Sequence, residues 1–597
     1  MYLWNITING MGNQFYAGAA QAGSTNWEAL LFGSLDPENF ITVDKPPVSQ
    51  WVMGLSGQIF GFSSSSMLIP EALMAVATVA LLYGAVARIT TPRTGLLAGL
   101  AFALTPVAVL MFRFNNPDAV MVLLMMAGAY CTVRALQHAG PKWIALAGVA
   151  LGFAFLAKML EGLMVMPAIG LVYLIAAPAP LRRRLLHLLG SLVAFVVSAG
   201  WFVVLTLLWP ASSRPYIAGS TDNNFMNLVL GYNGFARVLG RNHMDFPDPR
   251  PGTRQGFGGF MNQSQGASRL FSGEFGYEIG WLIPAALLGM VLVIVSRGRA
   301  PRTDLVRAGA ILFGGWLLVD GVVLSFMKGM VHPYYCLSLA PAVAGMFALG
   351  VHEMWARRAT WFGRIGLGAM LLVTGGWSAW ILQRDSWLPA LRWTILGLTV
   401  VATVALVATL VLRAHGHYVR AALASGVIVA LAGSAAYAIA TIGEPHSGGG
   451  PKVGPAATAQ SDGPDGGPGP TRGRAWGETE DDPRLDAMLS TTHTDWSAAI
   501  VRSSAAAGLE LKSHTAVMAI GGFSGRDPVP TLSEFQQYVA NHQVTYYIVA
   551  DDYEDHAGSF SWPGGQHTDI TNWVVANYAP VRVDDYTVYN LAGPPKH

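Results

Sequence analysis

Apolar runs of membrane-spanning length recur through the first three quarters of the 597-residue chain. A helix needs about 20 mostly apolar residues to cross a bilayer, and lipid offers an unpaired backbone no hydrogen-bond partner. The sequence therefore predicts a mainly α-helical, polytopic membrane bundle of about 12 spans. The expected spans are 66–87, 94–111, 117–136, 143–158, 160–177, 185–209, 277–296, 305–326, 333–351, 361–382, 388–412 and 419–441.

The composition also indicates a membrane protein with a polar appendage. Hydrophobic residues make up 52% of the chain and charged residues 12%, whereas a soluble domain carries about 25% charge. The formal net charge of +2 provides no basic excess. We therefore expect the lipid bilayer, and no nucleic acid, among the partners. Cys131 and Cys336 both lie in apolar runs, which is typical of small core residues rather than of a disulfide or metal site.

The N-terminus resembles the end of a hydrophobic helix whose beginning is missing. Residues 1–8 have this character, and the sequence shows no signal peptide. We therefore expect that the start is truncated and that one further span, the thirteenth, belongs upstream.

Basic residues concentrate in alternate short loops, which predicts the orientation in the cell membrane. Loops rich in Arg and Lys stay in the cytoplasm. The opposite loops, and everything after the last span, should then lie on the outer face. The basic residues that define the cytoplasmic loops are Arg88, Arg93, Arg134, Lys142, Arg182, Arg183, Arg184, Arg297, Arg299, Arg302, Arg307, Arg357, Arg358, Arg364, Arg413 and Arg420.

Three of the seven lysines break this charge rule. Lys45, Lys158 and Lys328 all fall at expected outer helix ends. Ionisable residues at membrane depth are costly and usually functional, although a single lysine there can also snorkel to the interface. The three together favour an anion-binding site on the outer face.

The segment 36–47 ends in Asp44-Lys45-Pro46-Pro47 and precedes the helical array. Residues before a proline avoid the α conformation, so the Asp-Lys pair should be held in extended backbone at the membrane edge. The simpler alternative is a loop that starts a helix with proline in its first turn.

The composition divides the chain into three parts. Residues 1–442 form the membrane domain, with outer loops at 9–65 and 210–276 and short interfacial helices near 12–23 and 47–61. Residues 443–479 are rich in Gly and Pro and predict a flexible linker. Residues 480–597 predict a soluble, extracytoplasmic α/β domain. The loop 210–276 contains His243, Asp245 and Asp248, but their spacing matches no zinc pattern.

The C-terminal domain shows buried strands at 515–520 and 544–550, a helix at 532–541 and a closing strand or hairpin at 581–591. Trp496, Trp562 and Trp573 could stack on sugars, although core packing is the more common use of such side chains. Residues 521–525, which read Gly-Gly-Phe-Ser-Gly, lack the strand–Ser–helix context of a nucleophile, and we assign them no catalytic role.

Four polar motifs share the expected outer face. Their cations suit a phosphate held near the membrane surface, and their carboxylates suit a general base. Asp118, at the start of a helix, either complements the helix dipole or faces the site. The combination suits transfer of a group from a lipid phosphate to an outer acceptor. The motifs are Asp44-Lys45, the 113–118 segment Arg-Phe-Asn-Asn-Pro-Asp, Lys158 with Glu161, and the 328–335 segment Lys-Gly-Met-Val-His-Pro-Tyr-Tyr.

The order of these motifs resembles the family-39-like, C-type membrane glycosyltransferases, which include the protein O-mannosyltransferases and ArnT. The phrases at 41–47 and 112–118, together with Met-Ala-Ile-Gly-Gly-Phe at 518–523, are similar to the YkcB-like bacterial branch. Each motif alone is weak, but their order covers essentially the whole chain.

The resemblance implies thirteen helices and a hexosyl- or pentosyltransferase that uses a polyprenyl-phosphate sugar. Transfer would invert the anomeric centre, and the acceptor would be an extracytoplasmic protein, cell-wall polymer or glycolipid. The first outer loop of such enzymes carries an acidic pair, whereas this chain has Asn13-Gln14 there. An amide cannot accept a proton as a base, which leaves Asp118 and Asp44 as candidates, and the family's second acidic motif favours Asp118.

The same resemblance implies the binding residues. Lys45 would hold the donor phosphate with Asp44 beside it, and Asn13 and Tyr16 would contact the sugar. The other implied substrate-binding residues are Arg113, Asn116, Lys158, Lys328, His332 and Tyr335.

Three questions stay open at this stage. A transporter or flippase would place charges in broken helices near the membrane midplane, whereas these charges lie at helix ends. A catalytically inactive scaffold or binding relative would fit the Asn13-Gln14 substitution and the large outer domain. The outer carboxylates also leave a divalent cation open, although no spacing demands one.

Overall fold

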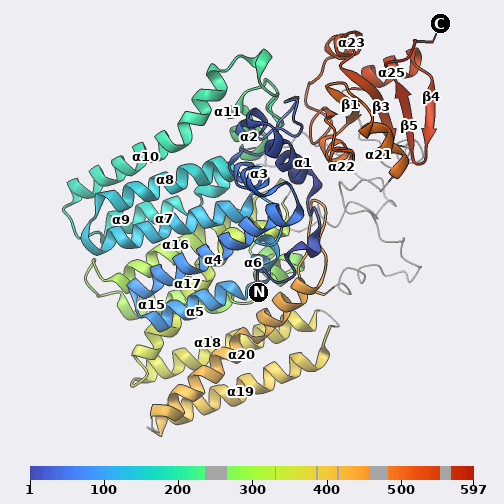
Figure 1. Ribbon diagram of the computed structural model, residues 1–597. Helices are drawn as coiled ribbons and strands as arrows, with labels where there is room; N and C mark the ends of the chain where they lie inside the picture. Colours follow the sequence, from blue (N-terminus) through green and yellow to red (C-terminus); the bar gives the residue numbers. More distant parts are fainter. Residues whose placement is uncertain are drawn as a thin grey trace.

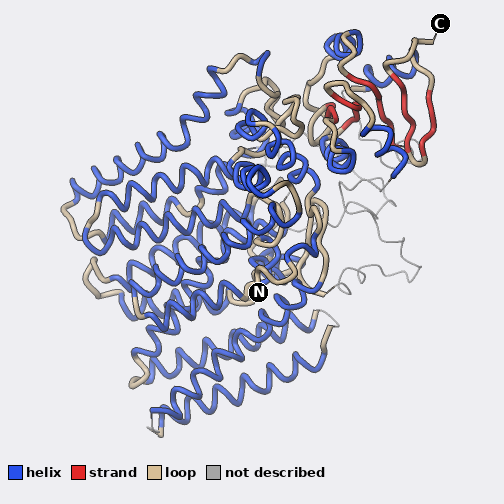
Figure 2. Tube along the Cα trace, viewed as in Figure 1, coloured by secondary structure: helices blue, strands red, loops and turns tan. Residues whose placement is uncertain are grey.

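The structure is a computed structural model. It describes residues 1–235, 265–329, 331–384, 387–412, 416–455, 482–550 and 567–596. A helical bundle forms most of the molecule, and a separate α/β domain lies against one end of it (Figure 1). Figure 2 shows the extended sheet only in that second domain, within the described residues. The predicted fold class is thereby confirmed.

Nine helical stretches in the described ranges are long and apolar enough to span a membrane. Two shorter apolar helices, α9 (Met166–Ala176) and α15 (Ile283–Arg297), accompany them. The spanning stretches are α4 (Ser64–Ile89), α7 (Asp118–His138), α8 (Pro141–Lys158) with η2 (Met159–Leu163), α10 (Leu181–Leu208), α16 (Leu305–Phe326), η6 (Pro333–Leu339) with α17 (Ala340–Ala356), α18 (Trp361–Gln383), α19 (Pro389–Val411) and α20 (Gly416–Gly443).

One expected span is broken. The run 94–111 forms two helices, α5 (Pro92–Ala103) and α6 (Pro106–Met111), that meet at Thr105. Pro106 disfavours the α conformation of the residue before it, which a hydropathy pattern does not register. The count of about twelve spans therefore stays a prediction.

The helices differ in how much of their surface faces outward. α17 is almost wholly buried and forms the centre of the bundle, whereas α10 leaves most of its apolar surface exposed. Leu189, Val193 and Val197 on α10 are each more than half exposed. Exposed aliphatic surface of this extent requires an apolar surrounding, and the protein is accordingly a multi-pass membrane protein.

Short helices occupy the end of the bundle next to the C-terminal domain (Figure 1). The expected helices at 12–23 and 47–61 correspond to α1 (Gln14–Thr25) and α3 (Val48–Phe60). They are not simply interfacial, because α1 packs between α3 and the C-terminal domain. The other short elements are η1 (Ile6–Asn9), α2 (Trp27–Phe32), η3 (Ala211–Ser213), α11 (Phe225–Asn227), η4 (Leu228–Phe235), η5 (Arg269–Phe271) and α14 (Gly273–Glu278).

The C-terminal domain contains a five-stranded sheet in the order β2-β1-β3-β5-β4. The first three of these strands are parallel, and β5 and β4 continue antiparallel to β3. The strands are β1 (Trp496–Val501), β2 (Val517–Ile520), β3 (Val544–Ala550), β4 (Pro580–Val583) and β5 (Tyr586–Asn590). The helices are α21 (Pro483–Ser490), α22 (Ser503–Ser513), α23 (Leu532–Ala540) and α25 (Thr568–Asn577).

The expected strands and helix of this domain are present, but β1 was not predicted. Its centre contains Ala498 and Ala499, and alanine favours helices in isolation. The helix α23 begins with a capping box in which Thr531 and Glu534 each bond the other's backbone N–H. His243, Asp245, Asp248 and Trp562 lie outside the described residues.

Candidate functional site

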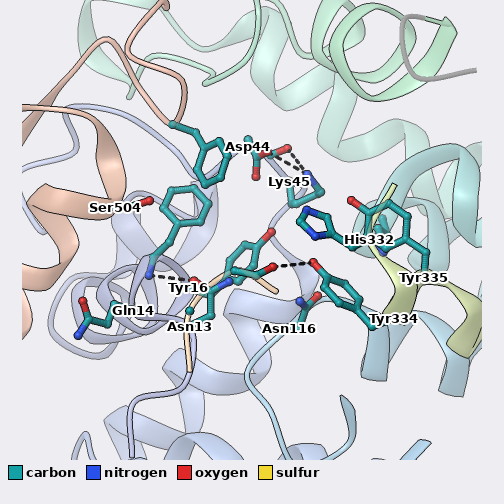
Figure 3. Close-up of a pocket in the computed structure, with 15 residues that line it drawn as sticks. Asn13, Gln14, Tyr16, Asp44, Lys45, Asn116, His332, Tyr334, Tyr335 and Ser504 are labelled. Carbon is teal, nitrogen blue, oxygen red and sulfur yellow. Dashed lines mark hydrogen bonds and ion pairs between the residues drawn. The ribbon is translucent and has the colours of Figure 1, made fainter. Parts of the chain in front are cut away.

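A cavity lies where the bundle, the short helices and the C-terminal domain meet (Figure 3). Its empty volume is about 610 Å³, which includes space open to solvent. Eight of the residues expected in the site line it. The full lining is Asn13, Gln14, Phe15, Tyr16, Asp44, Lys45, Asn116, Lys158, His332, Tyr334, Tyr335, Gly448, Gly449, Ser504 and Phe523.

The Asp44-Lys45 pair is presented to the cavity by a loop that is itself bonded to distant backbone. In this loop, the Thr42 N–H donates to the Tyr216 carbonyl at 2.9 Å. The Lys45 Nζ atom lies 3.0 Å from Asp44 Oδ2 and 3.1 Å from Asn233 Oδ1. Both members of the pair are buried. Asp44 Oδ1 is also buried and has no hydrogen-bond partner among the described residues, so it is available to a proton from a ligand.

Lys158 is the last residue of α8 and lines the cavity. Its ammonium pairs with Asp118 Oδ1 at 2.7 Å and with Glu161 Oε1 at 3.0 Å. The same Nζ atom lies 3.8 Å from the centre of the Tyr335 ring. The helix ends here because Met159 adopts a φ of 54°. Lys158 is thus fixed by two carboxylates and one aromatic face.

Asp118 is fully buried and does not line the cavity. It makes no side-chain cap at the start of α7. Asp118 lies in the first turn of the helix, where its charge complements the helix dipole, as the first of the two alternatives expects. Its Oδ1 atom pairs with Lys158, which lines the cavity.

The 332–335 segment supplies an aromatic wall. The His332 ring stacks on Tyr334, with ring centres 5.1 Å apart and planes inclined by 15°. Tyr335 lies beside both rings and beneath Lys158. The structure therefore brings together motifs that are about 170 positions apart in the sequence.

The side-chain amide of Asn115 connects the 113–118 segment to the first outer loop. The Asn115 Oδ1 atom accepts from the Asn13 backbone N–H, and Asn115 Nδ2 donates to the Asn13 carbonyl, both at 2.8 Å. Asn13 in turn caps α1 by accepting from the Phe15 N–H. The next residue, Asn116, lines the cavity, and its buried Nδ2 has no protein partner in the described part of the chain.

Tyr16 projects into the cavity from α1 (Figure 3). Burial, and secondarily the charge of Asp44, raises the pKa of its phenol well above the ordinary value. Tyr16 is therefore protonated at any physiological pH and can donate a hydrogen bond to a ligand.

Besides Asp118, two further expected site residues lie outside the lining of the cavity. The Arg113 guanidinium binds the backbone carbonyls of Met1, Tyr2, Trp4 and Asn5. It fixes the N-terminal segment rather than lining the cavity. Lys328 is exposed and also lies outside the lining.

Two family models match the chain. The model described as dolichyl-phosphate-mannose-protein mannosyltransferase matches residues 44–203, and that of the "putative mannosyltransferase YkcB-like, C-terminal" domain matches residues 485–577. The Bacillus subtilis protein named "putative mannosyltransferase YycA" is 27% identical, across 98% of this chain and 93% of its own length. Its relative YkcB, from the same organism, is 26% identical across 96% and 89%.

The predicted family resemblance is confirmed. The chain is similar to the YkcB-like membrane glycosyltransferases over nearly its whole length. The fold is also that of ArnT from Cupriavidus metallidurans, whose structure was solved with undecaprenyl phosphate bound. That likeness has a TM-score of 0.52 at 16% identity and covers 99% of this chain and 97% of ArnT.

The YkcB-like C-terminal domain contributes residues that we did not predict for the site. Ser504, in the first turn of α22, and Phe523, which follows β2, both line the cavity. The Phe523 ring lies 5.0 Å from that of Phe15 on α1. The sequence signal was the Gly521-Gly522-Phe523 phrase, to which we assigned no catalytic role.

The first part of the expected linker also reaches the cavity. Gly448 and Gly449 line it, and the Gly448 N–H donates to the Gly12 carbonyl at 3.1 Å. His446 is anchored nearby through its N–H to Asn9 Oδ1. This stretch therefore binds the first loop, while residues 456–479 of the expected linker lie outside the described ranges.

The C-terminal domain is docked through buried polar contacts. The Trp496 indole N–H donates to Asp36 Oδ1 at 3.1 Å, and the Gly219 N–H donates to Asp527 Oδ2 at 2.9 Å. Burial raises the pKa of Asp36 to about 7, although hydrogen bonds from Trp496 and the local backbone lower it. Burial likewise raises the pKa of Asp527 to about 7. Trp496 is therefore used in the interface and not exposed for sugar stacking.

In the described ranges, no three His, Cys, Asp or Glu side chains are grouped closely enough to hold a metal ion. The Asp118–Lys158–Glu161 cluster has a lysine at its centre, so its carboxylates already share a cation. The question of a divalent cation stays open.

Proposed function

We propose that the protein transfers a sugar from a polyprenyl-phosphate donor to an acceptor hydroxyl on the outer face of the cell membrane. The observation that carries the proposal is the Asp44-Lys45 pair, a carboxylate with one unpartnered oxygen beside a buried ammonium in the cavity. The fold and the mannosyltransferase-like relatives support the reaction class.

The two ammonium groups that line the cavity have different roles in this proposal. Lys45 and Lys158 both line the cavity and can each bind oxygens of a donor phosphate. Lys158 is held in place by Asp118 and Glu161. Lys45 is paired with Asp44 at 3.0 Å. A phosphate that draws Lys45 away from Asp44 would release the carboxylate for catalysis.

The chemical step then follows from Asp44. An acceptor hydroxyl placed against Asp44 Oδ1 loses its proton to this carboxylate while its oxygen attacks the anomeric carbon of the donor sugar. The bond from that carbon to the phosphate oxygen breaks, and polyprenyl phosphate leaves as an anion beside Lys45 and Lys158. Attack from the side opposite the phosphate inverts the anomeric centre.

The structure leads us to prefer Asp44 over Asp118 as the base. Asp44 lines the cavity, whereas Asp118 is buried beside it with one oxygen committed to Lys158. We assign Asp118 to the positioning of Lys158. The distribution of arginines in the loops supports an outer position for the cavity.

The test uses purified protein in nanodiscs with undecaprenyl-phosphate mannose, glucose and arabinose, each labelled in the sugar. We expect the wild type to release labelled sugar to water or to an envelope extract from one of these donors. A Lys45→Ala variant should bind that donor at least tenfold more weakly. Absence of turnover with every donor and extract would instead support an inactive binding relative.

A further inference from the structure

The cavity has two chemically different walls. The wall from the membrane domain holds Asp44, Lys45 and Lys158. The wall from the C-terminal domain presents Ser504 and Phe523, which carry no charge. In Figure 3, Ser504 lies on the side of the cavity opposite His332 and Tyr335. A donor phosphate belongs with the charged wall, which leaves the uncharged wall for the other substrate.

Phe523 is held by a rigid loop. Gly521, Gly522 and Gly525 adopt φ values of 73°, 65° and 74°, a region that other residues rarely enter. A Cβ atom at Gly522 would lie 2.0 Å from Asp527 Oδ2. The Ser503 N–H donates to the Gly522 carbonyl at 3.0 Å, which ties this loop to the start of α22. The backbone of the loop that carries Phe523 is therefore constrained.

This wall also lies at the edge of the sheet where α/β domains usually bind ligands. Ser504 follows β1 and Phe523 follows β2, and these strands are parallel neighbours. Ligands of open α/β sheets bind outside the carboxyl ends of the parallel strands. The carboxyl edge of this sheet faces the cavity, because both loops line it.

The domain is fastened over the cavity. Besides the bonds of Asp36 and Asp527, the Gln21 amide nitrogen lies 2.9 Å from His514 Nδ1. A Cβ atom placed on Gly18 of α1 would lie 3.0 Å from the Cβ of Ala507 on α22. This part of the C-terminal domain is therefore close-packed against α1.

We infer that the acceptor is a carbohydrate chain end and that the C-terminal domain is its recognition surface. This inference rests on the proposed function. A sugar ring presents apolar C–H groups that pack on an aromatic face, and its hydroxyls bond to neutral hydroxyl and amide groups. Phe523 provides the face, and Ser504 and Gln14 provide the polar partners.

The deciding experiment measures acceptor binding without donor turnover. Saturation-transfer NMR is recorded on the full chain in nanodiscs with methyl glycosides of mannose, glucose and galactose, the matching disaccharides, and a Ser/Thr-rich hexapeptide. We expect binding of at least one glycoside and not of the peptide. Phe523→Ala should weaken that binding about tenfold, Phe523→Tyr should retain it, and Ser504→Ala should weaken it to a smaller degree.

The matched control is Val581→Ala, on the exposed face of strand β4. It should leave glycoside binding unchanged. Equal binding by wild type and Phe523→Ala, or peptide binding that Phe523→Ala removes, would overturn the inference. Failure of every labelled donor to react, with glycoside binding through Phe523 intact, would overturn the proposed function but not the carbohydrate site.

Discussion

The Lys158 ammonium lies 2.7 Å from Asp118 Oδ1, with both side chains buried. This pair joins the first residue of α7 to the last residue of α8. Two motifs that are 40 positions apart in the chain therefore become one structural unit. We therefore propose that Asp118 positions Lys158 rather than serving as a free base.

Breaking this pair should destabilise the protein. Asp118→Asn leaves a buried ammonium with less compensation, and loss of one partner of a buried pair costs about 3–5 kcal/mol. We expect a lower thermal midpoint and weaker donor binding. The double variant Asp118→Asn/Lys158→Met should recover part of the midpoint but not donor binding. Additive losses in the double variant would show that the two side chains are not coupled.

Arg113 should behave as a structural residue. Its guanidinium binds four backbone carbonyls of the N-terminal segment, and a lysine cannot reproduce this planar fork. Arg113→Lys should lower the thermal midpoint and leave the KM for donor unchanged in the fraction that remains folded. A raised donor KM at an unchanged midpoint would return Arg113 to the binding site.

The stability of the docked state should fall as pH rises. The pKa of Asp36 and that of Asp527 are each raised to about 7 from 3.8 by burial. The docked state therefore binds more protons than the open chain between these values. The favourable contribution of the protonated carboxyls is complete below 3.8 and is lost as pH rises through about 7.

The corresponding measurement compares thermal midpoints at pH 5.5 and pH 8, which bracket the native pKa of about 7. The wild type should be less stable at the higher pH. Asp36→Asn keeps an oxygen for the Trp496 indole and cannot ionise, so its midpoint should change less. The exposed Asp584→Asn variant is the control. A midpoint that rises with pH, or an Asp36→Asn variant with the wild-type slope, would contradict this account.

Docking of the C-terminal domain should be required for acceptor use. Gly18→Leu places a side chain where a Cβ atom alone would lie 3.0 Å from Ala507. We expect faster proteolysis between the domains and at least tenfold less transfer to acceptor. Gly170→Leu, on α9, is the matched control because no atom lies within 4 Å of its Cβ position. Transfer by Gly18→Leu at the wild-type rate would show that docking of the C-terminal domain is not required.

Much of the fold could be predicted from local patterns. Hydropathy located the long helices, and a short apolar run predicted the buried strand β3, because spanning helices and buried strands each have a characteristic length. The strand β1 and the break before Pro106 were missed. In β1, packing overrides the helical preference of alanine. Between α5 and α6, the single residue Pro106 interrupts an otherwise continuous apolar run.

The candidate site was only partly predictable. Lys45 and Lys158 stood out as cations in unusual positions, and both line the cavity. Arg113 looked equivalent in sequence, but whether a cation binds a ligand or its own backbone depends on contacts made only after folding. Phe523 lies 508 positions from its neighbour Phe15, and no local pattern encodes that approach.

The central claim is that Asp44 is the base. Its most direct test compares Asp44→Asn with Asp118→Asn in purified protein, measuring single-turnover sugar transfer at saturating labelled donor. Asp44→Asn should bind donor but transfer sugar about 10²–10⁴-fold more slowly, as expected for loss of a general base. Asp118→Asn, once saturated, should retain a substantially higher rate. Full transfer by Asp44→Asn together with abolished transfer by saturated Asp118→Asn would contradict the account.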